Sequence, residues 1–516
     1  MSEGRSPLAV MTEPRDTRID RLLAQAHEAL GSRRLVVVSN RGPVEFRLTP
    51  SGDAQAQRGS GSLVTSFSSL MRNMEFTWVS STMGEADRKA WEKGGGARIP
   101  SGLPGNKVML RLLSPPRRAY HKFYNTLCNP ILWFLQHYMW STPYTPTIDQ
   151  SVYDAWENGY VEVNKAFAET VAAEAVEDGS GACILVHDYH LYLVGGYLRA
   201  ALPKAVIQHM VHIPWPAPDY WELLPAFIRR DICAGLCGAD IVGFQTPRDG
   251  VNFLQCCDEF LPQVEVAYKE RSVLFKGHRT QVRTYPLSIN ADEVRRLSTS
   301  MRVRDYERQL TALPGEQVIV RVDRAEPNKN ILRGLHAYET LLQRYPDFKG
   351  KVKFLAFLVP SRTHIRQYQR YAEEIQEAVK GINSAQGQPE WMPVHLYMEN
   401  NYTLAVAGMR IYDVLLVNPV ADGMNLVAKE GPVVNGRDGV LVMSETAGGY
   451  PQLADGCLGV SPADVEGTML AMHQALTMGP EERQRLRAKL VATVEREDVG
   501  HWFQRQFEDI KALKQE

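Results

Sequence analysis

Polar residues that can do chemistry follow directly after several short apolar runs of the chain. They fall in six segments: Asn40-Arg41-Gly42-Pro43, His187-Asp188-Tyr189-His190, His212-Ile213-Pro214-Trp215-Pro216, Asp323-Arg324, Pro360-Ser361-Arg362 and Asp422-Gly423-Met424-Asn425. In open parallel sheets, ligands bind beyond the carboxyl ends of the strands, where the strand order reverses. Each segment taken alone is typical of an ordinary helix cap or turn. Together they predict a ligand site at the strand ends.

The pair Arg324 and Lys329 predicts a diphosphate site. The two cations flank a short loop that leads into a helix expected from residue 331 onward. A guanidinium and an ammonium beside a helix amino terminus can bind phosphate oxygens, and the helix dipole and free amide groups add to the attraction. The alternative is a solvated loop that carries two exposed cations.

A second strand-loop-helix passage spans residues 421–430. Gly423 lets the backbone approach a ligand closely, and Asn425 is expected to begin the helix. Glu430 lies one turn into that helix, where its carboxylate could accept two ribose hydroxyls, and an ordinary solvated carboxylate is the alternative. The chain has no glycine-rich dinucleotide fingerprint after its first apolar run and no P-loop, which argues against dehydrogenases and nucleotide hydrolases.

The elements that must position these residues indicate an α/β fold. Short and nearly continuous apolar runs alternate with helix-like stretches, and the runs expected as strands are 35–38, 183–186, 206–211, 318–320, 354–359 and 414–417. Continuous apolarity indicates burial on both faces, as in parallel strands covered by helices. We expect a disordered leader over residues 1–16 and a helix over 17–30. Between Tyr285 and Gly315 a charged helical stretch connects two series of strands. This boundary predicts two lobes with a cleft between them.

The composition excludes several classes of protein. The 516 residues include 58 Lys+Arg and 59 Asp+Glu, so the formal net charge is −1. This balance gives no electrostatic reason to expect nucleic acid or an anionic membrane as partner. No apolar run approaches the roughly 20 residues of a bilayer span, and the amino terminus lacks the apolar core of a secretory signal. We therefore expect a soluble, cytoplasmic protein.

The seven cysteines are scattered along the chain, which makes disulfides unexpected. Cys233 and Cys237 have the spacing of helical metal ligands, but no second Cys/His pair lies nearby to complete a tetrahedral site. We interpret them as core residues, and we expect no metal site.

Five motifs carry a resemblance to a known family: Val38-Ser39-Asn40-Arg41, His187-Asp188-Tyr189-His190-Leu191, His212-Ile213-Pro214-Trp215-Pro216, Gly243-Phe244-Gln245-Thr246 and Asp422-Gly423-Met424-Asn425-Leu426-Val427-Ala428-Lys429-Glu430. Together they resemble the trehalose-6-phosphate synthase family of retaining glycosyltransferases, from about Leu35 to about Phe507. The resemblance implies a GT-B fold with two Rossmann-like parallel-sheet lobes and an interlobe active-site cleft. It also implies metal-independent transfer of glucose from a nucleotide-glucose to glucose 6-phosphate, without a cofactor, and it leaves a homo-oligomer open.

We accordingly divide the chain into four parts. Residues 1–32 form the amino-terminal leader and helix, residues 33–290 the acceptor-binding lobe, and residues 291–480 the lobe that binds the nucleotide sugar. Residues 481–516 are expected to be a helix that returns to the first lobe.

The resemblance implies roles for individual donor-side residues. Arg324 and Lys329 resemble the pair that holds the donor diphosphate, and Glu430 resembles the ribose ligand. The remaining donor-binding residues implied by the motifs are Gly61 in a mobile glycine loop, His212 beside the donor sugar, and Asp422, Gly423, Met424, Asn425, Leu426 and Val427 around the glucose and phosphates.

On the acceptor side, Arg41, Tyr124, Trp133 and Arg362 resemble the residues that clamp the phosphate of glucose 6-phosphate. Asp188 would orient the acceptor hydroxyls. The catalytic set implied by the family is therefore Asp188, His212, Arg324 and Lys329. The family's same-face reaction lets the leaving phosphate take the acceptor proton, so no carboxylate nucleophile is required.

Three departures from the family pattern bear on the substrates. The usual Arg-Leu-Asp-Tyr-Ser-Lys-Gly loop reads Arg324-Ala325-Glu326-Pro327-Asn328-Lys329-Asn330 here, which keeps both cations and changes the residues between them. Because a hydrogen-bonding site rejects the wrong base strongly, we favour GDP-glucose over UDP-glucose as donor. Ser81 stands near a usual tryptophan position, and Ala421 stands where an arginine usually precedes the Asp-Gly-Met-Asn block.

Three alternative functions stay open. The altered loop also resembles cyclitol-coupling pseudo-glycosyltransferases, although the block that begins at Asp422 is intact here and changed in those relatives. A glucosylglycerol-phosphate synthase would use the same donor lobe with a smaller acceptor. A non-catalytic sugar-phosphate sensor could dispense with the cations and with Asp188 and His212, all of which this chain retains.

Overall fold

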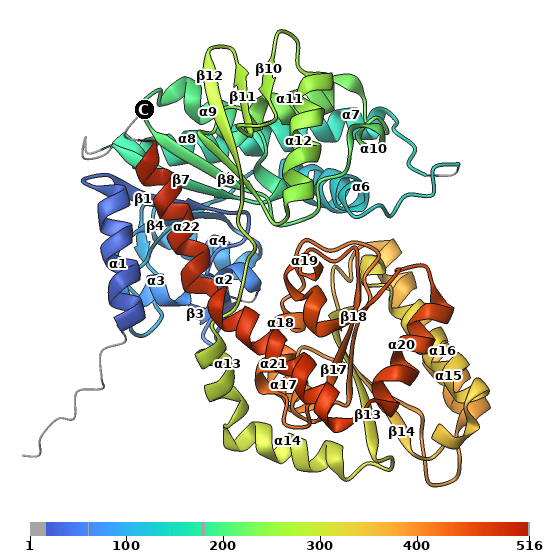
Figure 1. Cartoon of the computed structure of the whole chain (residues 1–516). Coiled ribbons are helices and arrows are strands. Elements are labelled where there is room, and N and C mark those ends of the chain that lie inside the picture. The colour runs from blue at the N-terminus through green and yellow to red at the C-terminus, as the bar shows by residue number, and fades with distance from the viewer. Residues whose placement is uncertain (1–16, 60, 144, 177–180, 514–516) are drawn as a thin grey trace, which may run out of the picture.

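The computed structural model describes residues 17–59, 61–143, 145–176 and 181–513. These residues form two α/β lobes, each built around its own sheet (Figure 1). The predicted class, an α/β protein with two parallel-sheet lobes, is confirmed. The helix expected over 17–30 is α1 (Thr17–Leu30), while the leader over 1–16 lies outside the described residues.

The first lobe holds a ten-stranded sheet with the order β10-β11-β12-β9-β8-β7-β1-β4-β6-β5. The strands from β12 to β6 run parallel, and β10, β11 and β5 are antiparallel edges. Their bounds are β1 Arg34–Val38, β4 Thr77–Ser81, β5 Ile99–Pro100, β6 Met109–Leu113, β7 Ala182–His187, β8 Val206–Met210, β9 Ile241–Phe244, β10 Glu265–Ala267, β11 Ser272–Phe275 and β12 His278–Thr284. The order reverses between β1 and β7, so this lobe's ligand crevice is expected at their carboxyl ends.

The second lobe holds a six-stranded parallel sheet with the order β15-β14-β13-β16-β17-β18. Its strands are β13 Gln317–Arg324, β14 Val352–Val359, β15 Val394–Met398, β16 Val414–Val417, β17 Val440–Ser444 and β18 Cys457–Val460. This is the doubly wound order of dinucleotide-binding folds, with its switch point between β13 and β16. A separate hairpin, β2 (Val44–Leu48) with β3 (Ala54–Arg58), follows β1.

Helices pack around both sheets (Figure 1). Those that precede the interlobe crossover are α2 Ser62–Ser66, α3 Ser68–Asn73, α4 Glu85–Lys93, α5 Arg117–His121, α6 Phe134–Gln136, α7 Gln150–Ala155, α8 Glu162–Val176, α9 Val194–Ala201, α10 Pro218–Trp221, α11 Ala226–Leu236 and α12 Pro247–Phe260. Two π-helical segments, Lys122–Trp133 and Trp156–Val161, continue α5 and α7. The later helices are α13 Ala291–Ser298, α14 Met301–Thr311, α15 Ile331–Arg344, α16 Arg366–Gln386, α17 Tyr402–Ile411, α18 Val427–Val434, α19 Tyr450–Leu453, α20 Val465–Thr477, α21 Pro480–Arg496 and α22 Val499–Ala512.

The carboxy-terminal segment contains two helices with different partners. Helix α21 packs on α18 of the second lobe, whereas α22 crosses back and packs along α1 (Figure 1). Trp502, Phe503 and Phe507 of α22 are buried in a cluster with Leu22 and Ala26 of α1. The chain therefore crosses between the lobes twice, once before α13 and once before α22.

Each apolar run predicted as a strand lies within or overlaps a strand of the two sheets, namely β1, β7, β8, β13, β14 and β16. Cys233 and Cys237 are buried in the first lobe's core, as predicted.

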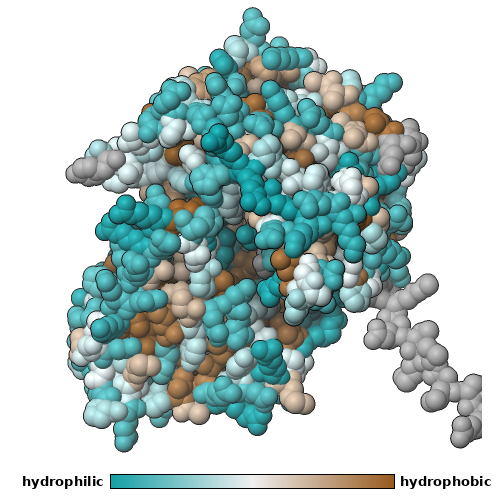
Figure 2. Space-filling view, turned by 180° about the vertical axis from the view of Figure 1, so that it is seen from behind, coloured by the Kyte–Doolittle hydropathy of each residue, from teal (hydrophilic) through white to brown (hydrophobic). Residues whose placement is uncertain are grey.

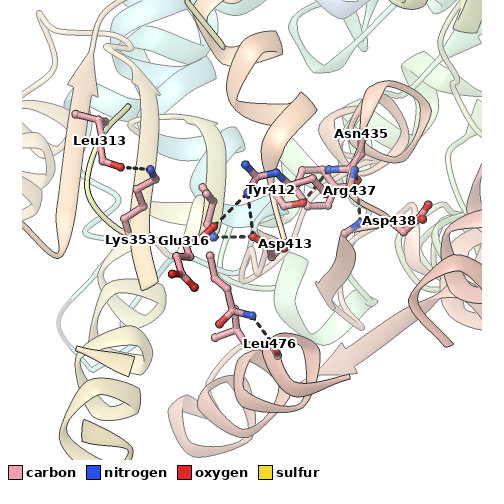
Figure 3. A network of polar contacts seen from close by, with 12 residues as sticks. Leu313, Glu316, Lys353, Tyr412, Asp413, Asn435, Arg437, Asp438 and Leu476 are labelled. Carbon is pink, nitrogen blue, oxygen red and sulfur yellow. Dashed lines mark hydrogen bonds and ion pairs between the residues drawn. The ribbon is translucent and has the colours of Figure 1, made fainter. Parts of the chain in front are cut away.

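A polar network around Asp413 and Arg437 lies at the amino-terminal edge of the second sheet (Figure 3). Asp413, just before β16, accepts hydrogen bonds from the backbone N–H of Val318 at 2.9 Å and from Arg483 of α21 at 2.9 Å. Arg437 approaches the same carboxylate at 3.5 Å. Nearby, burial lowers the pKa of Lys353 to about 8. These groups lie at the strand starts, opposite the switch point, so we assign the network to stability.

Candidate active site

The switch point of the second sheet is spanned by an ion pair. Lys329, in the turn after β13, places Nζ 2.5 Å from Oδ2 of Asp422, in the loop after β16. The same oxygen accepts from Asn425 Nδ2 at 3.1 Å, and Asp323 lies 3.8 Å from Nζ. Burial favours the neutral form of Asp422, but the Lys329 charge outweighs it and lowers the carboxyl pKa. A fixed cation thus lies at the crevice where the fold places ligands.

Glu326 holds two arginines beside this pair. Arg324, the last residue of β13, and Arg362, in the loop after β14, each donate to Oε1 of Glu326 at 2.9 Å. Ser361 donates to the same atom at 2.6 Å. Burial acts to raise the pKa of Glu326, but the two guanidinium groups lower it to about 2. The carboxylate is therefore ionised and orients both cations.

Trp133 of the first lobe is the contact that joins this cluster to the other lobe. The Arg362 guanidinium lies 4.2 Å from the centroid of the indole ring, and that of Arg324 lies 5.5 Å from it. His137, one turn on, stacks on the same ring at 4.0 Å. Arg362 also donates to the Tyr189 hydroxyl at 3.4 Å. The second lobe's arginines thus meet the first lobe through an aromatic wall.

The other predicted acceptor residues converge on His190, at the carboxyl end of β7. Tyr124 stacks on His190 with ring centroids 5.9 Å apart. Burial lowers the pKa of His190 well below its usual value, and the charges of Arg362 and Arg41 add to this effect. Arg41 itself is exposed. Two cations from different lobes therefore surround a neutral imidazole and an aromatic ring, an arrangement that suits a phosphate.

Asp188 is held in an unusual conformation at the end of β7. Its φ is 76°, a left-handed value that costs energy for a residue with a side chain. Burial raises its pKa to about 6, against hydrogen bonds from the backbone of Tyr189 and His212 that lower it. Among the described residues, nothing hydrogen-bonds its buried Oδ1. Strain and an unpaired carboxylate oxygen at a strand end indicate a ligand-binding role.

His212 follows β8, and both of its ring nitrogens face protein groups. Nε2 lies 3.0 Å from His187 Nδ1, and Nδ1 lies 3.2 Å from Gln245 Nε2. Burial lowers the pKa of His212 to about 4, so the ring is neutral near pH 7. Its backbone carbonyl packs against the second lobe, because a Cβ added to Gly423 would lie only 1.9 Å from that oxygen. Gly423 is thus required for the lobes to approach here.

The ribose candidate Glu430 lies in the first turn of α18 and accepts a hydrogen bond from the Tyr402 hydroxyl at 2.9 Å. Burial raises its pKa to about 7. The expectation that Asn425 begins this helix is wrong, because the helix starts at Val427 with Leu426 as its cap. Asn425 instead has φ 69°, with its amide bonded back to Asp422. Met424 is buried among first-lobe residues.

Gly61 stands apart from these clusters. It is exposed, precedes α2 with φ 121°, and has open space where a Cβ would project. The conformation is one that glycine adopts easily.

Buried polar atoms without a hydrogen-bond partner gather around the strand ends. Within the part of the chain that the structure describes, they include Asn40 Nδ2, His137 Nε2, His187 Nε2, Asp188 Oδ1, Glu326 Oε2 and Asn425 Oδ1. Since buried polar groups are normally paired, those at the strand ends indicate a place for a polar ligand. The surface is hollowed where the lobes meet (Figure 2). The described residues contain no cluster of three or more His, Cys, Asp or Glu that could hold a metal.

The structure adds residues that sequence reasoning did not assign to the site, namely His137, Tyr189, Gln245 and Glu326. Glu326 had a detectable signal, a carboxylate between two cations. Gln245 stands in the motif Gly243-Phe244-Gln245-Thr246, which marked the position but not its partners. Its contact with His212 depends on packing between distant elements.

Two doubly wound lobes that meet at their switch points, with cations on one side and an unpaired carboxylate on the other, define a GT-B glycosyltransferase. A family model described as glycosyltransferase family 20 matches residues 33–512. The chain belongs to this family of glycosyltransferases.

Named relatives agree with this assignment. The chain is 32% identical over 476 residues to the UDP-forming alpha,alpha-trehalose-phosphate synthase of Botryotinia fuckeliana, covering 89% of this chain and 84% of that protein. It is 31% identical over 475 residues to the corresponding synthase A of Dictyostelium discoideum, covering 91% of this chain and 61% of that longer protein.

Solved structures share the fold over nearly the whole chain. An E. coli trehalose-6-phosphate structure bound with UDP-2-fluoro glucose superposes with a TM-score of 0.78 at 26% identity, covering 93% of this chain and 99% of that one. A Burkholderia xenovorans synthase in complex with glucose-6-phosphate gives a TM-score of 0.76 at 26% identity, covering 92% and 99%. Separately, no helix within the described residues has the length and apolar character of a membrane span.

Proposed function

We propose that this chain is a trehalose-6-phosphate synthase, which transfers glucose with retention from a nucleotide-glucose to glucose 6-phosphate. The observation that carries the proposal is the presence of two anion-binding clusters that meet at Trp133. One comprises Lys329 and Arg324 at the switch point of the second sheet, and the other comprises Arg362 with Arg41. A diphosphate donor and a phosphorylated acceptor need two such clusters, placed side by side.

In this proposal the second lobe, residues 291–480, binds the donor. Lys329 and Arg324 stabilise the negative charge that develops on the departing diphosphate, because cations fixed by Asp422 and Glu326 need little reorganisation. Glu430 accepts the ribose hydroxyls. The residues from Asp422 to Val427 lie along the glucose and phosphates, with Gly423 against His212. Gly61 belongs to a loop that closes over the donor.

The first lobe, residues 33–290, binds the acceptor. Arg41, Tyr124 and Trp133 hold the sugar phosphate together with Arg362 from the second lobe. Asp188, with its unpaired oxygen, orients the acceptor hydroxyl toward the anomeric carbon. The departing phosphate oxygen takes the proton of that hydroxyl on the same face, so neither a metal nor a carboxylate nucleophile takes part. Helices α21 and α22 connect the lobes.

We propose UDP-glucose as the donor, since the relatives are named UDP-forming. The expectation of GDP-glucose is not confirmed. The expectation of GDP-glucose depended on the altered loop between Arg324 and Lys329. Two residues of this loop, Glu326 and Asn328, form hydrogen bonds with other protein groups. Glu326 bonds the arginines, and Asn328 donates to the Ala421 carbonyl at 3.3 Å. Those substitutions are thus explained by contacts within the protein rather than by base recognition.

The test incubates the purified chain with glucose 6-phosphate and either UDP-glucose or GDP-glucose, without added metal. Nucleoside diphosphate release and disaccharide phosphate are followed by mass spectrometry. We expect trehalose 6-phosphate with UDP-glucose, and a faster reaction with GDP-glucose would reverse the base assignment. Parallel reactions with glycerol 3-phosphate and with cyclitol phosphates test the two other transferase functions. Binding of sugar phosphate without turnover of any pair would indicate the sensor function instead.

A further inference from the structure

A chain of hydrogen bonds links the second lobe to His212 through the crossover segment. The backbone N–H of Leu287 donates to Gln245 Oε1 at 2.8 Å, and the backbone carbonyl of the same residue accepts from Lys429 Nζ at 2.7 Å. Lys429 precedes Glu430 in α18, and Gln245 lies in the first lobe, after β9. The two adjacent peptide groups of one residue, Leu287, are therefore held from both lobes.

This arrangement fixes the orientation of the Gln245 amide. A backbone N–H can only donate, so the atom facing Leu287 must be the side-chain oxygen. The NH₂ group then faces His212, where its nitrogen lies 3.2 Å from Nδ1. An amide NH₂ can only donate, which makes His212 Nδ1 an acceptor.

The tautomer of His212 follows from this orientation. A neutral imidazole whose Nδ1 accepts carries its proton on Nε2, and that nitrogen lies 3.0 Å from His187 Nδ1. Both ring nitrogens are thereby fixed, so the ring cannot rotate without loss of two hydrogen bonds. The backbone of Leu287, whose carbonyl Lys429 holds, therefore sets the plane and the tautomer of a residue at the reacting centre.

We propose that Gln245 is a positioning residue, which sets the orientation and tautomer of His212, and that Lys429 couples this setting to the second lobe through the backbone of Leu287. The proposal deepens the proposed function and depends on it for the role of His212. Approach of α18 toward the first lobe aligns the Leu287 backbone, the Gln245 amide and then the imidazole. The catalytic geometry of His212 would thus be complete only when the donor lobe is in place.

Among the groups around His212, Gln245 is the one whose hydrogen bond decides which ring nitrogen carries the proton. The titratable groups near it are His187 on β7, His209 on β8 and the Asp188 carboxylate, which accepts from the His212 backbone. Burial lowers the pKa of both neighbouring histidines. Trp502 of α22 and the Gly423 backbone complete the enclosure.

The decisive variant is Gln245→Glu, which is nearly isosteric. A carboxylate still accepts from Leu287, but it can no longer donate to His212. We expect the His212 Nδ1 to become protonated, with an upward shift of the His212 pKa in the pH profile of kcat/KM. Nitrogen NMR of ring-labelled histidine, with the signal assigned through His212→Asn, reads the tautomer without relying on activity. We expect kcat/KM at pH 7 to fall by about tenfold, the value of one hydrogen bond.

Two further variants separate positioning from simple stability. Gln208→Met removes a fully buried glutamine whose amide donates to Gln506 at 2.6 Å, and it should leave the His212 signal and the pH profile unchanged. Lys429→Met should lower kcat/KM on its own, and the double variant with Gln245→Met should lose no more than Gln245→Met alone, because both act through the backbone of Leu287.

The inference is overturned if Gln245→Glu leaves the His212 tautomer as in the unaltered chain, or if the two losses simply add. An unaltered chain without synthase activity would instead remove the proposed function, and the NMR measurement would still decide whether Gln245 sets the tautomer.

Discussion

Lys329 and Asp422 form an ion pair of 2.5 Å across the switch point of the second sheet. The pair joins the two loops that follow β13 and β16, so it fixes the width of the crevice. It also keeps the ammonium charged and in place before a ligand arrives, since the neighbouring carboxylates raise the Lys329 pKa against the effect of burial.

Lys329→Met should therefore abolish synthase activity, with kcat/KM reduced by about a hundredfold or more, because a fixed charge at the departing diphosphate is lost. It should also destabilise the protein, since Asp422 is left buried and unpaired. The double change Lys329→Met with Asp422→Asn should recover the melting temperature but not the activity. Arg308→Ala, at an exposed cation on α14, serves as the control. Restored activity in the double variant would contradict the role of the charge.

The shared carboxylate of Glu326 predicts a coupled effect on both substrates. Glu326→Gln should raise the KM for the donor and for glucose 6-phosphate together, each by about tenfold, because Arg324 and Arg362 lose the group that orients them. The pKa of about 2 means that this effect is independent of pH between 5 and 9. Initial-rate kinetics with each substrate varied in turn measure it.

Arg362→Lys should raise the KM for the acceptor alone, whereas Glu326→Gln should raise the KM for both substrates. Glu374→Gln, on the surface of α16, should change neither constant. An effect of Glu326→Gln confined to one substrate would show that the carboxylate does not join the two sites.

The fold was largely predictable from the sequence, because strands buried on both faces leave continuous apolar runs. The expectations over 35–38 and 414–417 correspond to β1 and β16 for that reason. The partly buried strands β10 and β15 were not predicted, and neither were β4, β9 and β17, although these three are buried along their whole length.

The sequence predicted that the site residues lie at strand ends, but it did not predict which strand ends lie next to one another. Which strand ends meet depends on the strand order, and this order brings the loop after β14, with Arg362, to Trp133 of the other lobe. The start of α18 was misplaced by two residues because Asn425 has the short amide typical of a helix cap, yet its side chain bonds Asp422 in a left-handed turn.

The raised pKa of Asp188 predicts opposite effects on stability and activity. The folded pKa of about 6 lies above the unfolded value of about 3.9. The native state therefore disfavours the charged form, and this destabilisation develops as the pH rises from about 4 to above 6. Asp188→Asn should accordingly raise stability by about 2 kcal/mol at pH 8 and have no such effect below pH 4. Denaturant unfolding at both pH values measures the difference.

The same change should lower the rate of transfer, because a neutral amide oxygen accepts from the acceptor hydroxyl more weakly than an ionised carboxylate does. In the unaltered chain, kcat/KM should fall as the pH drops through about 6. Glu430→Gln should retain this acid limb while raising the KM for the donor. An acid limb that disappears in Glu430→Gln would assign it to the ribose carboxylate instead of Asp188.

Close approach of the lobes at Gly423 predicts a steric block. A Cβ at this position would lie 1.9 Å from the His212 carbonyl oxygen. Gly423→Ala should therefore hold the lobes apart, so that kcat falls by about a hundredfold while each lobe stays folded, because catalytic groups displaced by about 1 Å lose that much rate. Small-angle X-ray scattering should show a larger radius of gyration than that of the unaltered chain.

Gly381→Ala provides the matched control, since no atom lies within 4 Å of a Cβ at that position in α16. It should leave activity and radius of gyration unchanged and add about 0.5–1 kcal/mol of stability, as expected when a helical glycine is replaced. If Gly423→Ala were as active as Gly381→Ala, contact between the Gly423 loop and His212 could not be required for transfer. The reacting centre would then work without this close contact from the donor loop.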